Sequence, residues 1–341
     1  MIIGLQHRGF DVEVMTPADC YYATRMAAAG IRIYDFLPRR KVSAKAIRRI
    51  RATLLAGEHT ILYMFNNPAI ANGLLAAAGL PVKTVAYRGQ VGNISRYNPL
   101  AYLTHMSPRL DRIVCVANAV RDSLRGQLWN PSKAVTIYKG HDMAWYADVQ
   151  TADLTTLGIP KDAFVFVCVA NNRPRKGVPV LIEAAGYLPE DTPIHILLIG
   201  SGMDGGETRA LVDNSPLAGH FHLLGHRDDV LELVASAQAS VLPALRREGL
   251  PKTVIESMAL GVVPVVTATG GSPELVTAST GLVIPPGDPQ ALATAMLSLA
   301  GDAERARDMG QAARQRLTTE FSLQASIDQH ADLFTELAGQ L

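Results

Sequence analysis

The sequence predicts an α/β protein made of two Rossmann-like, doubly wound domains. Three observations favour this fold class. The chain has 341 residues, more than one ordinary hydrophobic core accommodates. Short apolar runs alternate with segments of helical periodicity, as expected for parallel α/β sheets. A polar, weakly periodic stretch divides this alternation, so we expect a first domain at 1–142, a hinge at 143–158 and a second domain at 159–320.

The first domain begins in an unusual way. Residues 1–9 have the pattern of the second half of a helix, and residues 11–15 have that of the strand after it. A doubly wound domain begins with a strand and a glycine-rich turn before its first helix, so we expect this domain to lack its first strand. Either the start codon is assigned too late or the protein is truncated.

The rest of the first domain alternates strands with helices. Strands are expected at 31–34, 60–65, 83–87, 112–116 and 134–138. Ligand-binding residues of such sheets lie at the carboxyl ends of the strands. Arg88, Gly89 and Asn93 follow one such strand and are candidates for that reason. His105 lies nearby, on a segment with the pattern of a helix.

Residues 39–51 form a basic segment with the pattern of an amphipathic helix. Its seven cations are Arg39, Arg40, Lys41, Lys45, Arg48, Arg49 and Arg51. One interpretation is a solvated helix with a basic outer face. The other is contact with an anionic membrane at the inner face of the plasma membrane, where each basic residue adds roughly 1 kcal/mol. Nucleic acid is not expected, because no aromatic interleaving or known nucleic-acid module accompanies the cations.

Composition adds three constraints. The formal net charge is only +1, but residues 1–142 contain 19 Lys and Arg against 8 Asp and Glu, and residues 143–341 contain 13 against 23. This asymmetry suggests that the first half meets an anionic partner. Three scattered cysteines are typical of a reduced, cytoplasmic protein and offer no metal-ligand spacing. No apolar run reaches the roughly 18–20 residues that a membrane span needs.

The second domain opens with an unbroken apolar strand at 164–170 and a basic turn. Arg173, Arg175 and Lys176 lie at the carboxyl end of this strand. Three cations in that place can neutralise a diphosphate leaving group, arginine through a bidentate fork and lysine as a point charge. A solvated basic turn is the alternative.

The next strand, 194–199, ends in the glycine pattern G-x-G-x-x-G at 200–205. That pattern alone is weak evidence for a dinucleotide site. Such a site also needs an acid at the end of the following strand to hold a ribose, but the strand at 221–224 ends in Gly225 and His226. We therefore interpret the glycines as a tight turn from strand to helix.

A pair of glutamates follows the strand at 239–243. Glu248 lies in the loop, and Glu256 lies inside the helix that begins near Pro251 and ends at Gly261. Free N–H groups at a helix start favour anions, and carboxylates bind neighbouring sugar hydroxyls. The arrangement predicts a ligand with phosphate in the middle and hydroxyl-rich groups at both ends, as in a nucleotide-sugar. Two surface glutamates on an amphipathic helix are the alternative.

Residues 248–256 resemble the Glu-x7-Glu motif of retaining glycosyltransferases of family 4, and residues 262–276 are similar to that family's glycine-pair loop. The resemblance implies the GT-B fold, in which two Rossmann-like domains face a cleft. It also implies that the final helix, 321–341, packs back on the first domain. Members of the family normally begin with a strand and a Gly-Gly loop, which this chain lacks.

The resemblance further implies roles for particular residues. Glu248 would hold hydroxyls of the transferred sugar, Arg173 and Lys176 would stabilise the departing diphosphate, and these three are the catalytic candidates. Arg175 competes with Arg173 for the place of the family's arginine. Glu256 would hold the ribose hydroxyls, and Arg88 stands where many relatives have a histidine. The other donor-binding candidates are Gly249, Leu250, Gly270, Gly271, Gly225 and Arg227, and the acceptor-side candidates are Arg88, Gly89 and Asn93.

The expected function is retaining, metal-independent transfer of a hexose-type sugar from a nucleotide-diphospho-sugar, without a cofactor. The acceptor would be a saccharide or a lipid-linked molecule in polysaccharide or lipopolysaccharide synthesis at the cell surface. A truncated, non-catalytic remnant that only binds a nucleotide-sugar is the alternative. A GT-B sugar epimerase shares the fold but not the combination of Glu-x7-Glu with Arg-x-x-Lys-Gly. The sequence leaves the donor base, the sugar and the linkage open.

Overall fold

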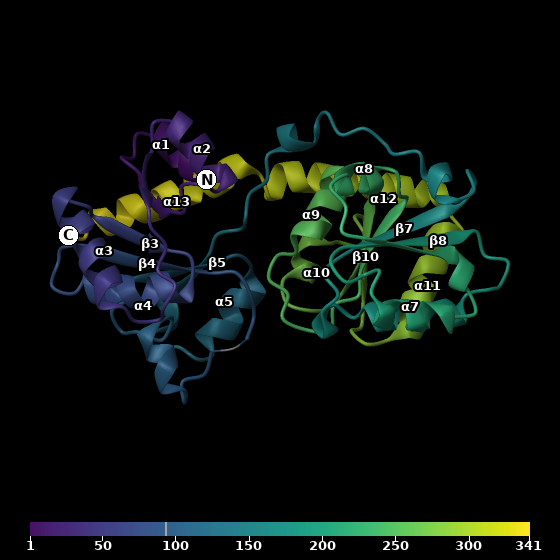
Figure 1. Cartoon of the computed structure of the whole chain (residues 1–341), viewed down its shortest axis with the longest axis horizontal. Helices are drawn as coiled ribbons and strands as arrows, with labels where there is room; N and C mark the ends of the chain where they lie inside the picture. Colours follow the sequence, from purple (N-terminus) through teal and green to yellow (C-terminus); the bar gives the residue numbers. More distant parts are fainter. Residues whose placement is uncertain (93) are drawn as a thin grey trace. The chain divides into compact units, whose positions relative to one another are not determined.

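The computed structural model describes residues 1–92 and 94–341, which form two compact units. Unit 1 comprises Met1–Gly140 and Leu323–Leu341, and unit 2 comprises His141–Ser322. Each unit is a parallel α/β structure (Figure 1), so the predicted fold class is confirmed. That these units act as the acceptor-side and nucleotide-sugar-binding domains expected from the sequence remains a proposal.

Unit 2 contains a six-stranded parallel sheet with the order β12-β11-β10-β7-β8-β9. Its strands are β7 (Phe164–Val169), β8 (Ile194–Ile199), β9 (Phe221–Gly225), β10 (Ala239–Leu242), β11 (Val263–Thr267) and β12 (Leu282–Ile284). Every residue of β8, β10 and β11 is buried. The sequences of such strands are continuous apolar runs, because helices cover both faces of the sheet.

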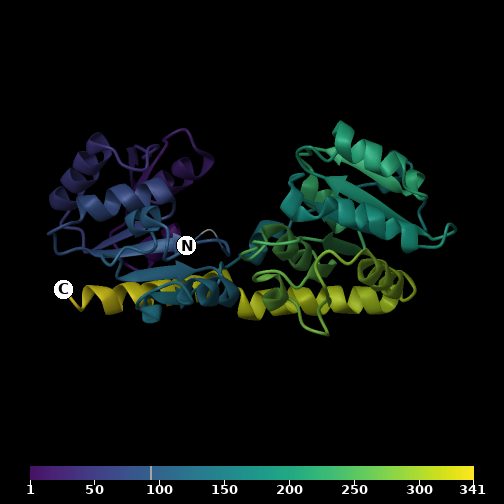
Figure 2. The same ribbon diagram turned by 90° about the horizontal axis from the view of Figure 1, so that it is seen from below.

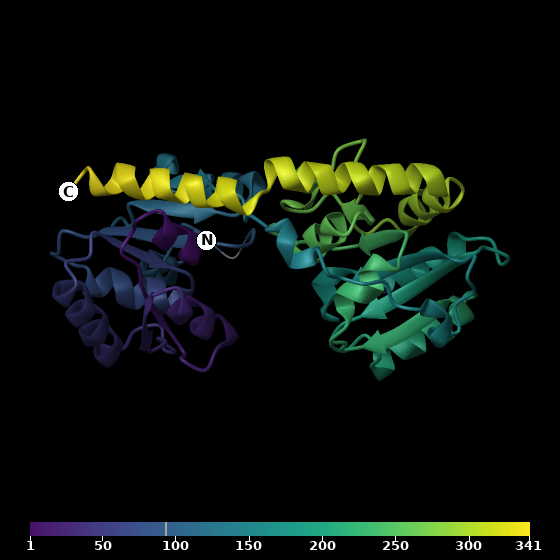
Figure 3. The same ribbon diagram turned by 90° about the horizontal axis from the view of Figure 1, so that it is seen from above.

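Helices cover the two faces of that sheet. They are α6 (Val178–Ala184), α7 (Gly206–Asp213), α8 (Val230–Ala235), α9 (Lys252–Ala259), α10 (Ser272–Leu275), α11 (Pro289–Ala300) and α12 (Ala303–Glu320). One core contains Phe166, Leu181, Ile196 and Leu292, and a second core on the other face contains Val167, Leu197 and Leu233. The long helix α12 packs against α9 and β11 (Figure 3).

The six strands of unit 1 fall into two parallel sheets. They are β1 (Glu13–Thr16) and β2 (Arg32–Asp35) in one sheet, and β3 (Ile61–Met64), β4 (Lys83–Arg88), β5 (Arg112–Cys115) and β6 (Ala134–Thr136) in the other. The division into two sheets was not expected from the sequence. Residues of β1 are only half-buried, whereas most of β4 and β5 is buried.

Helices pack on both sheets of unit 1, and α2 (Tyr21–Ala28) contacts β2 of the smaller one. The others are α1 (Ile2–His7), α3 (Ala44–Ala56), α4 (Asn67–Ala76), α5 (Asn118–Arg125) and α13 (Leu323–Ala338). Phe334 and Leu337 of α13 share a core with Val85, Val114 and Leu5. Figure 2 shows α13 lying along this sheet, so the last helix of the chain belongs to the core of unit 1.

The segment expected to be a hinge, 143–158, packs on unit 2. It contains the 3₁₀ helices η3 (Met143–Tyr146) and η4 (Leu154–Leu157). Leu154 and Leu157 contact the core cluster that includes Val167. Asp153 caps η4, since its carboxylate accepts a hydrogen bond of 3.0 Å from the N–H of Thr155. The polar residues that suggested a linker are therefore largely capping and turn residues.

Candidate donor site

The strand order of unit 2 reverses between β7 and β10. The chain runs outward from β7 through β8 to β9, and outward in the other direction from β10 through β11 to β12. β7 and β10 are neighbours, and the loops after them, 170–177 and 243–251, leave the same edge of the sheet. Ligands of open α/β sheets bind at such a switch point. The basic turn with Lys176 lies in the first of these loops. Glu248, the first residue of the Glu-x7-Glu motif, lies in the second.

Glu248 is the centre of this region. Its residue is only 4 % exposed, and its Oε1 accepts a hydrogen bond of 2.9 Å from the Nζ of Lys176. A guanidinium nitrogen of Arg175 lies 3.6 Å from the same oxygen. A buried carboxylate needs such partners, because an unpaired one is strongly destabilising. The structure thus brings together two of the three predicted catalytic residues, Glu248 and Lys176.

Arg173, which was expected to contact the departing diphosphate, precedes the 3₁₀ helix Pro174–Lys176 (η5) and is exposed. Of the two arginines of the turn, Arg175 is the one whose guanidinium lies beside Glu248. Both arginines remain candidates for contact with the diphosphate, and we propose Arg175 as the alternative to Arg173.

Glycine makes the contact between the first two loops possible. Gly177 has φ +72°, and a Cβ there would overlap the carbonyl oxygen of Pro243. The N–H of Leu245 donates a hydrogen bond of 2.8 Å to the carbonyl oxygen of Arg175. The backbones carrying Lys176 and Glu248 are consequently fixed to each other.

A third loop, after β11, supports Glu248 from the other side. Gly270 has φ +54°, and a Cβ there would overlap the carbonyl oxygen of Glu248. The hydroxyl of Thr267 donates a hydrogen bond of 2.5 Å to the carbonyl oxygen of Ala244. Arg247, directly before Glu248, has the left-handed φ of +65°, a strained conformation that is common at functional sites.

Glu256 lies in α9, as predicted, and its side chain is 13 % exposed. Lys252, one turn earlier, lies 2.6 Å from its carboxylate. Gly249 and Leu250 are buried between Glu248 and the start of this helix, and Gly271 directly precedes the helix α10. The N-terminus of α9, with its free N–H groups and positive dipole end, therefore adjoins the loop of Glu248.

Tyr146 was not predicted from the sequence. This residue is 6 % exposed, and its hydroxyl lies 3.0 Å from the Nδ1 of His141. Burial raises the pKa of Tyr146 above its usual range, and the carboxylate of Glu256 adds to the rise. Tyr146 therefore lies near Glu256. It was missed because it stands in a stretch that looks like a linker, where one buried aromatic residue gives no periodic signal.

Gly225 ends β9, and Arg227 follows it. The carbonyl oxygen of Gly225 accepts a hydrogen bond of 2.6 Å from the N–H of Gly200, which joins this turn to the one after β8. Arg227 forms two hydrogen bonds, of 2.8 and 2.6 Å, with the carboxylate of Asp229. Asp229 thus fixes the plane of the Arg227 guanidinium group. The predicted contact between Arg227 and a nucleotide base remains a proposal.

The acceptor-side candidates lie in unit 1. Arg88 ends β4, is 9 % exposed and donates a hydrogen bond to the carbonyl oxygen of Gly92. Gly89 follows it, beside the ring of Tyr87. Asn93 lies outside the described residues. His105 lies in a turn rather than in a helix, and burial, followed by the charge of Arg88, lowers its pKa to about 4.

Part of the basic segment 39–51 has a structural role. Its helix α3 buries Ala46, Ile50 and Leu54. The guanidinium group of Arg51 donates hydrogen bonds of 2.8 Å to the carbonyl oxygens of Ala76 and Ala78, at the end of α4. These bonds satisfy carbonyl groups that the end of a helix leaves free. The remaining cations still form a basic surface.

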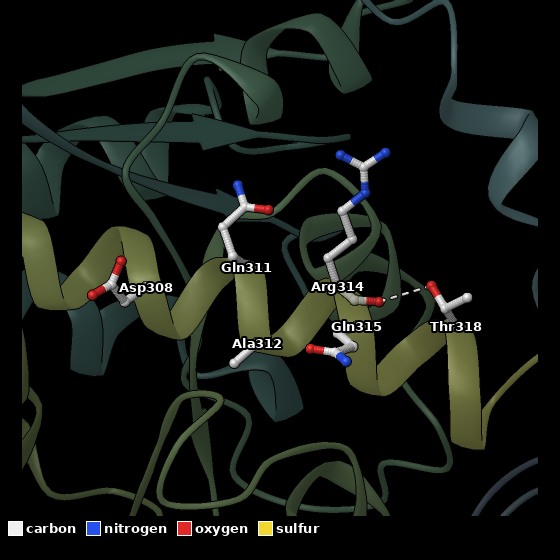
Figure 4. A pocket seen from close by; sticks show the side chains of 6 residues that line it. All are labelled: Asp308, Gln311, Ala312, Arg314, Gln315 and Thr318. Atoms are coloured by element: carbon white, nitrogen blue, oxygen red, sulfur yellow. Dashed lines mark hydrogen bonds between the residues drawn. The ribbon is translucent and has the colours of Figure 1, made fainter.

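Two thiols and one pocket fall outside the candidate site. Burial raises the pKa of Cys115 and of Cys168 to about 12, so both remain neutral thiols and core residues. A pocket on α12 is lined by Asp308, Gln311, Ala312, Arg314, Gln315 and Thr318 (Figure 4). All six come from one helix and none is a predicted site residue, so we place the donor site at the switch point.

Within the described residues, no helix combines the length and hydropathy needed to cross a bilayer.

Two family models match this chain. The family described as "Glycosyl transferases group 1" matches residues 149–316, and "Glycosyltransferase Family 4" matches residues 1–145. The chain belongs to these group 1, family 4 glycosyltransferases. The first match spans the β7 and β10 loops, and the second spans most of unit 1.

Several relatives and structures are similar to this chain. The N-acetyl-α-D-glucosaminyl L-malate synthase of Bacillus anthracis is 27 % identical over 231 residues, which cover 65 % of this chain and 60 % of that protein. The phosphatidyl-myo-inositol mannosyltransferase of Mycolicibacterium smegmatis is 25 % identical over 311 residues, covering 87 % and 78 %. The crystal structure of Anabaena HepE with UDP-glucose has a TM-score of 0.79 at 19 % identity and covers 99 % and 94 %. The chain thus spans less than two thirds of the Bacillus relative's length, and the last likeness concerns the fold alone.

Proposed function

We propose that this chain transfers a hexose-type sugar from a nucleotide-diphospho-sugar to a saccharide or lipid-linked acceptor, with retention at the anomeric carbon and without a metal. The observation that carries the proposal is the buried Glu248, paired with Lys176 at the switch point of the unit 2 sheet. The names of the relatives support a sugar donor, and the UDP-glucose complex of HepE supports a nucleotide-sugar of this kind. Synthesis of cell-surface glycans is the setting that we infer.

In this transfer reaction, the residues of the site would stabilise the charges that develop as the bond to the sugar breaks. When the bond between the anomeric carbon and the diphosphate breaks, the electron pair leaves with the diphosphate and positive charge develops on the sugar. The cations of Lys176 and Arg175, with the N-terminus of α9, would stabilise the departing phosphate. The acceptor hydroxyl then bonds to the anomeric carbon, and its proton passes to an oxygen of the departing diphosphate. The carboxylate of Glu248 would hold hydroxyls of the sugar so that this exchange occurs on one face.

Glu256 would hold the ribose hydroxyls. On the acceptor side, Arg88, Gly89 and Asn93 remain proposed contacts. We also retain the prediction that residues 39–51 meet an anionic membrane surface at the inner face of the plasma membrane. A non-catalytic remnant that binds the donor without using it is the second candidate, and turnover of a bound donor distinguishes the two.

Calorimetric titration with UDP, GDP and ADP, with Mg²⁺ or with EDTA, tests the proposal. We expect one nucleotide to bind equally well with and without the metal. Glu256→Ala should weaken that binding at least about tenfold, because a charge-assisted hydrogen bond contributes roughly 1.5–3 kcal/mol. The matched control is Glu304→Ala, which removes a glutamate whose side chain is 81 % exposed on α12 and should bind normally. No binding to the folded chain, or full binding by Glu256→Ala, would contradict the assigned site.

A further inference from the structure

A phenylalanine is exposed at the carboxyl edge of the larger sheet of unit 1. Phe65 directly follows β3, and 45 % of this residue is exposed. A single exposed apolar residue is ordinary. The position of Phe65 is not, because ligands of open α/β sheets bind at the carboxyl ends of the strands. The acceptor-side candidates Arg88 and Gly89 stand at the end of the neighbouring strand β4, at the same edge.

The ring of Phe65 lies against that of Tyr87. β3 and β4 pair in parallel with Tyr63 opposite Val85, so Phe65 and Tyr87, two residues further along, also lie side by side (Figure 1). Their ring centroids are 5.5 Å apart, with 40° between the planes. A Cβ on Gly89 would stand 3.2 Å from the ring of Tyr87. Phe65 is thus connected through one side chain to an acceptor-side candidate.

Packing holds the ring of Phe65 in place. Tyr63, on the same face of β3, has its ring centroid 4.4 Å from that of Phe65. The hydroxyl of Tyr63 lies 3.3 Å from the Nε2 of His330 in α13, and the ring of Phe334 packs edge-on against Tyr63 at 5.5 Å. Phe334 belongs to the core of unit 1. A ligand that contacts the exposed ring of Phe65 therefore does not have to order it first.

The side chains next to Phe65 in the two loops are polar. Asn66 caps α4 by accepting a hydrogen bond of 2.9 Å from the N–H of Ala69. Asn67 in the loop after β3 and Gln90 in the loop after β4 are both exposed. Their amide groups can donate and accept hydrogen bonds, as a hydroxyl-rich ligand requires. A lipid tail would find a single apolar ring here, whereas a sugar offers one apolar face of C–H groups and a rim of hydroxyls.

We propose that Phe65 is a stacking platform for a sugar ring of the acceptor. The C–H groups of one pyranose face would pack on the exposed side of the aromatic ring, and the amides of Asn67 and Gln90 would meet the hydroxyls. The part of the acceptor that unit 1 binds is then a saccharide, whether or not a lipid is attached further away. This assignment rests on the proposed sugar transfer and adds the chemical class of the acceptor to it.

Binding of simple sugars tests the platform without any turnover. Saturation-transfer NMR is recorded on the full chain with the methyl glycosides of glucose, galactose and mannose, in the absence of a donor. We expect saturation of the ring C–H protons of at least one glycoside. The signal should fall at least about fivefold in Phe65→Leu, which keeps an apolar side chain but removes the flat ring. Phe65→Met should behave in the same way, and Phe65→Trp should keep the signal.

Tyr187→Leu is the matched control for these variants. It removes an aromatic side chain of similar exposure, 50 %, from unit 2, and it should leave the signal unchanged. Thermal unfolding shows that each variant is folded. Since Phe65→Leu and Phe65→Met replace the ring by side chains of different shape, a result that both share belongs to the ring.

Steady-state transfer separates a role in acceptor binding from a structural one. With a membrane lipid extract as the source of acceptors, Phe65→Leu should raise the half-saturating amount of extract at least about fivefold. Its kcat and its KM for the donor should change little, because the platform touches neither the donor nor the reacting atoms. Phe65→Trp should restore the dependence on the extract. A lower kcat or a higher donor KM with an unchanged dependence on the extract would overturn the proposal.

Failure of the platform is distinguishable from failure of the proposed transfer. A chain that binds a glycoside through Phe65 but turns over no donor would keep the sugar platform and lose the transfer. A chain that transfers sugar but saturates none of the three glycosides would keep the transfer and overturn the platform. Equal saturation in the unchanged chain, Phe65→Leu and Phe65→Met would overturn it as well.

Discussion

Glu248 is held by two loops that come from widely separated parts of the chain. Lys176 and Arg175 approach it from the loop after β7, and Gly270 approaches its backbone from the loop after β11. Each of these contacts depends on one residue type: a cation in two cases and a residue without Cβ in the third. Two predictions at the scale of single residues test this arrangement.

The two arginines of the basic turn should differ in importance. Arg175→Gln removes a cation 3.6 Å from Glu248, whereas Arg173→Gln removes an exposed one. We expect Arg175→Gln to lower the rate of nucleoside diphosphate release at least about tenfold and Arg173→Gln to change it little. Steady-state kinetics on both variants makes the comparison, and each variant is the charge-matched control of the other. A larger effect at Arg173 would restore the original assignment.

Gly270→Ala should damage both stability and turnover. The new Cβ would overlap the carbonyl oxygen of Glu248, and φ of +54° is itself unfavourable by roughly 1–2 kcal/mol for a residue other than glycine. Thermal unfolding and donor turnover measure the two effects. Gly158→Ala is the control, because Gly158 has φ +79° and no heavy atom within 4 Å of the added Cβ. It should lose some stability and keep its turnover; equal behaviour of the two variants would argue against a specific contact with Glu248.

At this scale the sequence predicted Glu248, Lys176 and Glu256 in the right local structures. The apolar strand, the helix start near Pro251 and Gly261 with φ +76° are local signals, and they determine where the two glutamates stand. The choice between Arg173 and Arg175 is not local. It depends on how the turn after β7 crosses the loop after β10, and spacing along the chain does not contain that information.

At the scale of elements, the edge of the unit 2 sheet contains a cluster of histidines. The Nδ1 of His195 lies 3.1 Å from the Nε2 of His222, and its ring stacks on that of His220 with centroids 4.7 Å apart. His195 stands in β8 and His222 in β9, and parallel pairing of these strands places them together. The sequence did not predict the cluster, because the register between two strands cannot be read from either of them.

This cluster should make the stability of unit 2 depend on pH. Burial, then the neighbouring histidines, lowers the pKa of His195 to about 4, and burial lowers the pKa of His222 as well. The unfolded chain, with an ordinary histidine pKa of about 6.5, binds more protons below that pH than the folded chain does. Stability from the cluster is therefore complete above about pH 6.5 and is lost as the pH falls toward 4.

Thermal unfolding between pH 7 and pH 5 checks this expectation. The melting temperature of unit 2 should fall over that range, by about 2–4 °C for each kcal/mol of stability lost. The variant His195→Leu/His222→Leu should show a smaller fall. His226→Leu is the control, since the side chain of His226 is 80 % exposed and should leave the pH dependence intact. The same fall in all three proteins would assign the effect to other groups.

At the scale of the whole molecule, the charge is divided between the units. Unit 1 has 19 Lys and Arg against 10 Asp and Glu, a net charge of +9, and unit 2 has 13 against 21, a net charge of −8. The sequence already showed this asymmetry between 1–142 and 143–341. The difference in net charge is smaller between the two units than between these two halves of the sequence. The reason is that α13 adds Asp328, Asp332 and Glu336 to unit 1. The positive charge of unit 1 fits the proposed contact of residues 39–51 with an anionic membrane surface.

Two features at this scale were beyond the reach of the sequence. The strands of unit 1 form two sheets, and the stretch 143–158 packs on unit 2 through Leu154 and Leu157. Both depend on which surfaces meet after folding. The alternation of strands and helices, in contrast, is a local pattern, and it correctly predicted the class of fold in both units.

Donor turnover by Glu248→Gln tests the central claim most directly. Nucleoside diphosphate release is measured from UDP-glucose, GDP-mannose and ADP-glucose, with a membrane lipid extract as the source of acceptors. The unchanged chain should use one donor, and Glu248→Gln should lower its turnover at least about 100-fold, because one preorganised polar group at the reacting centre contributes roughly that factor. Glu183→Gln, at an exposed position on α6, should turn over normally. Near-normal turnover by Glu248→Gln would contradict the role of this carboxylate and the site built around it.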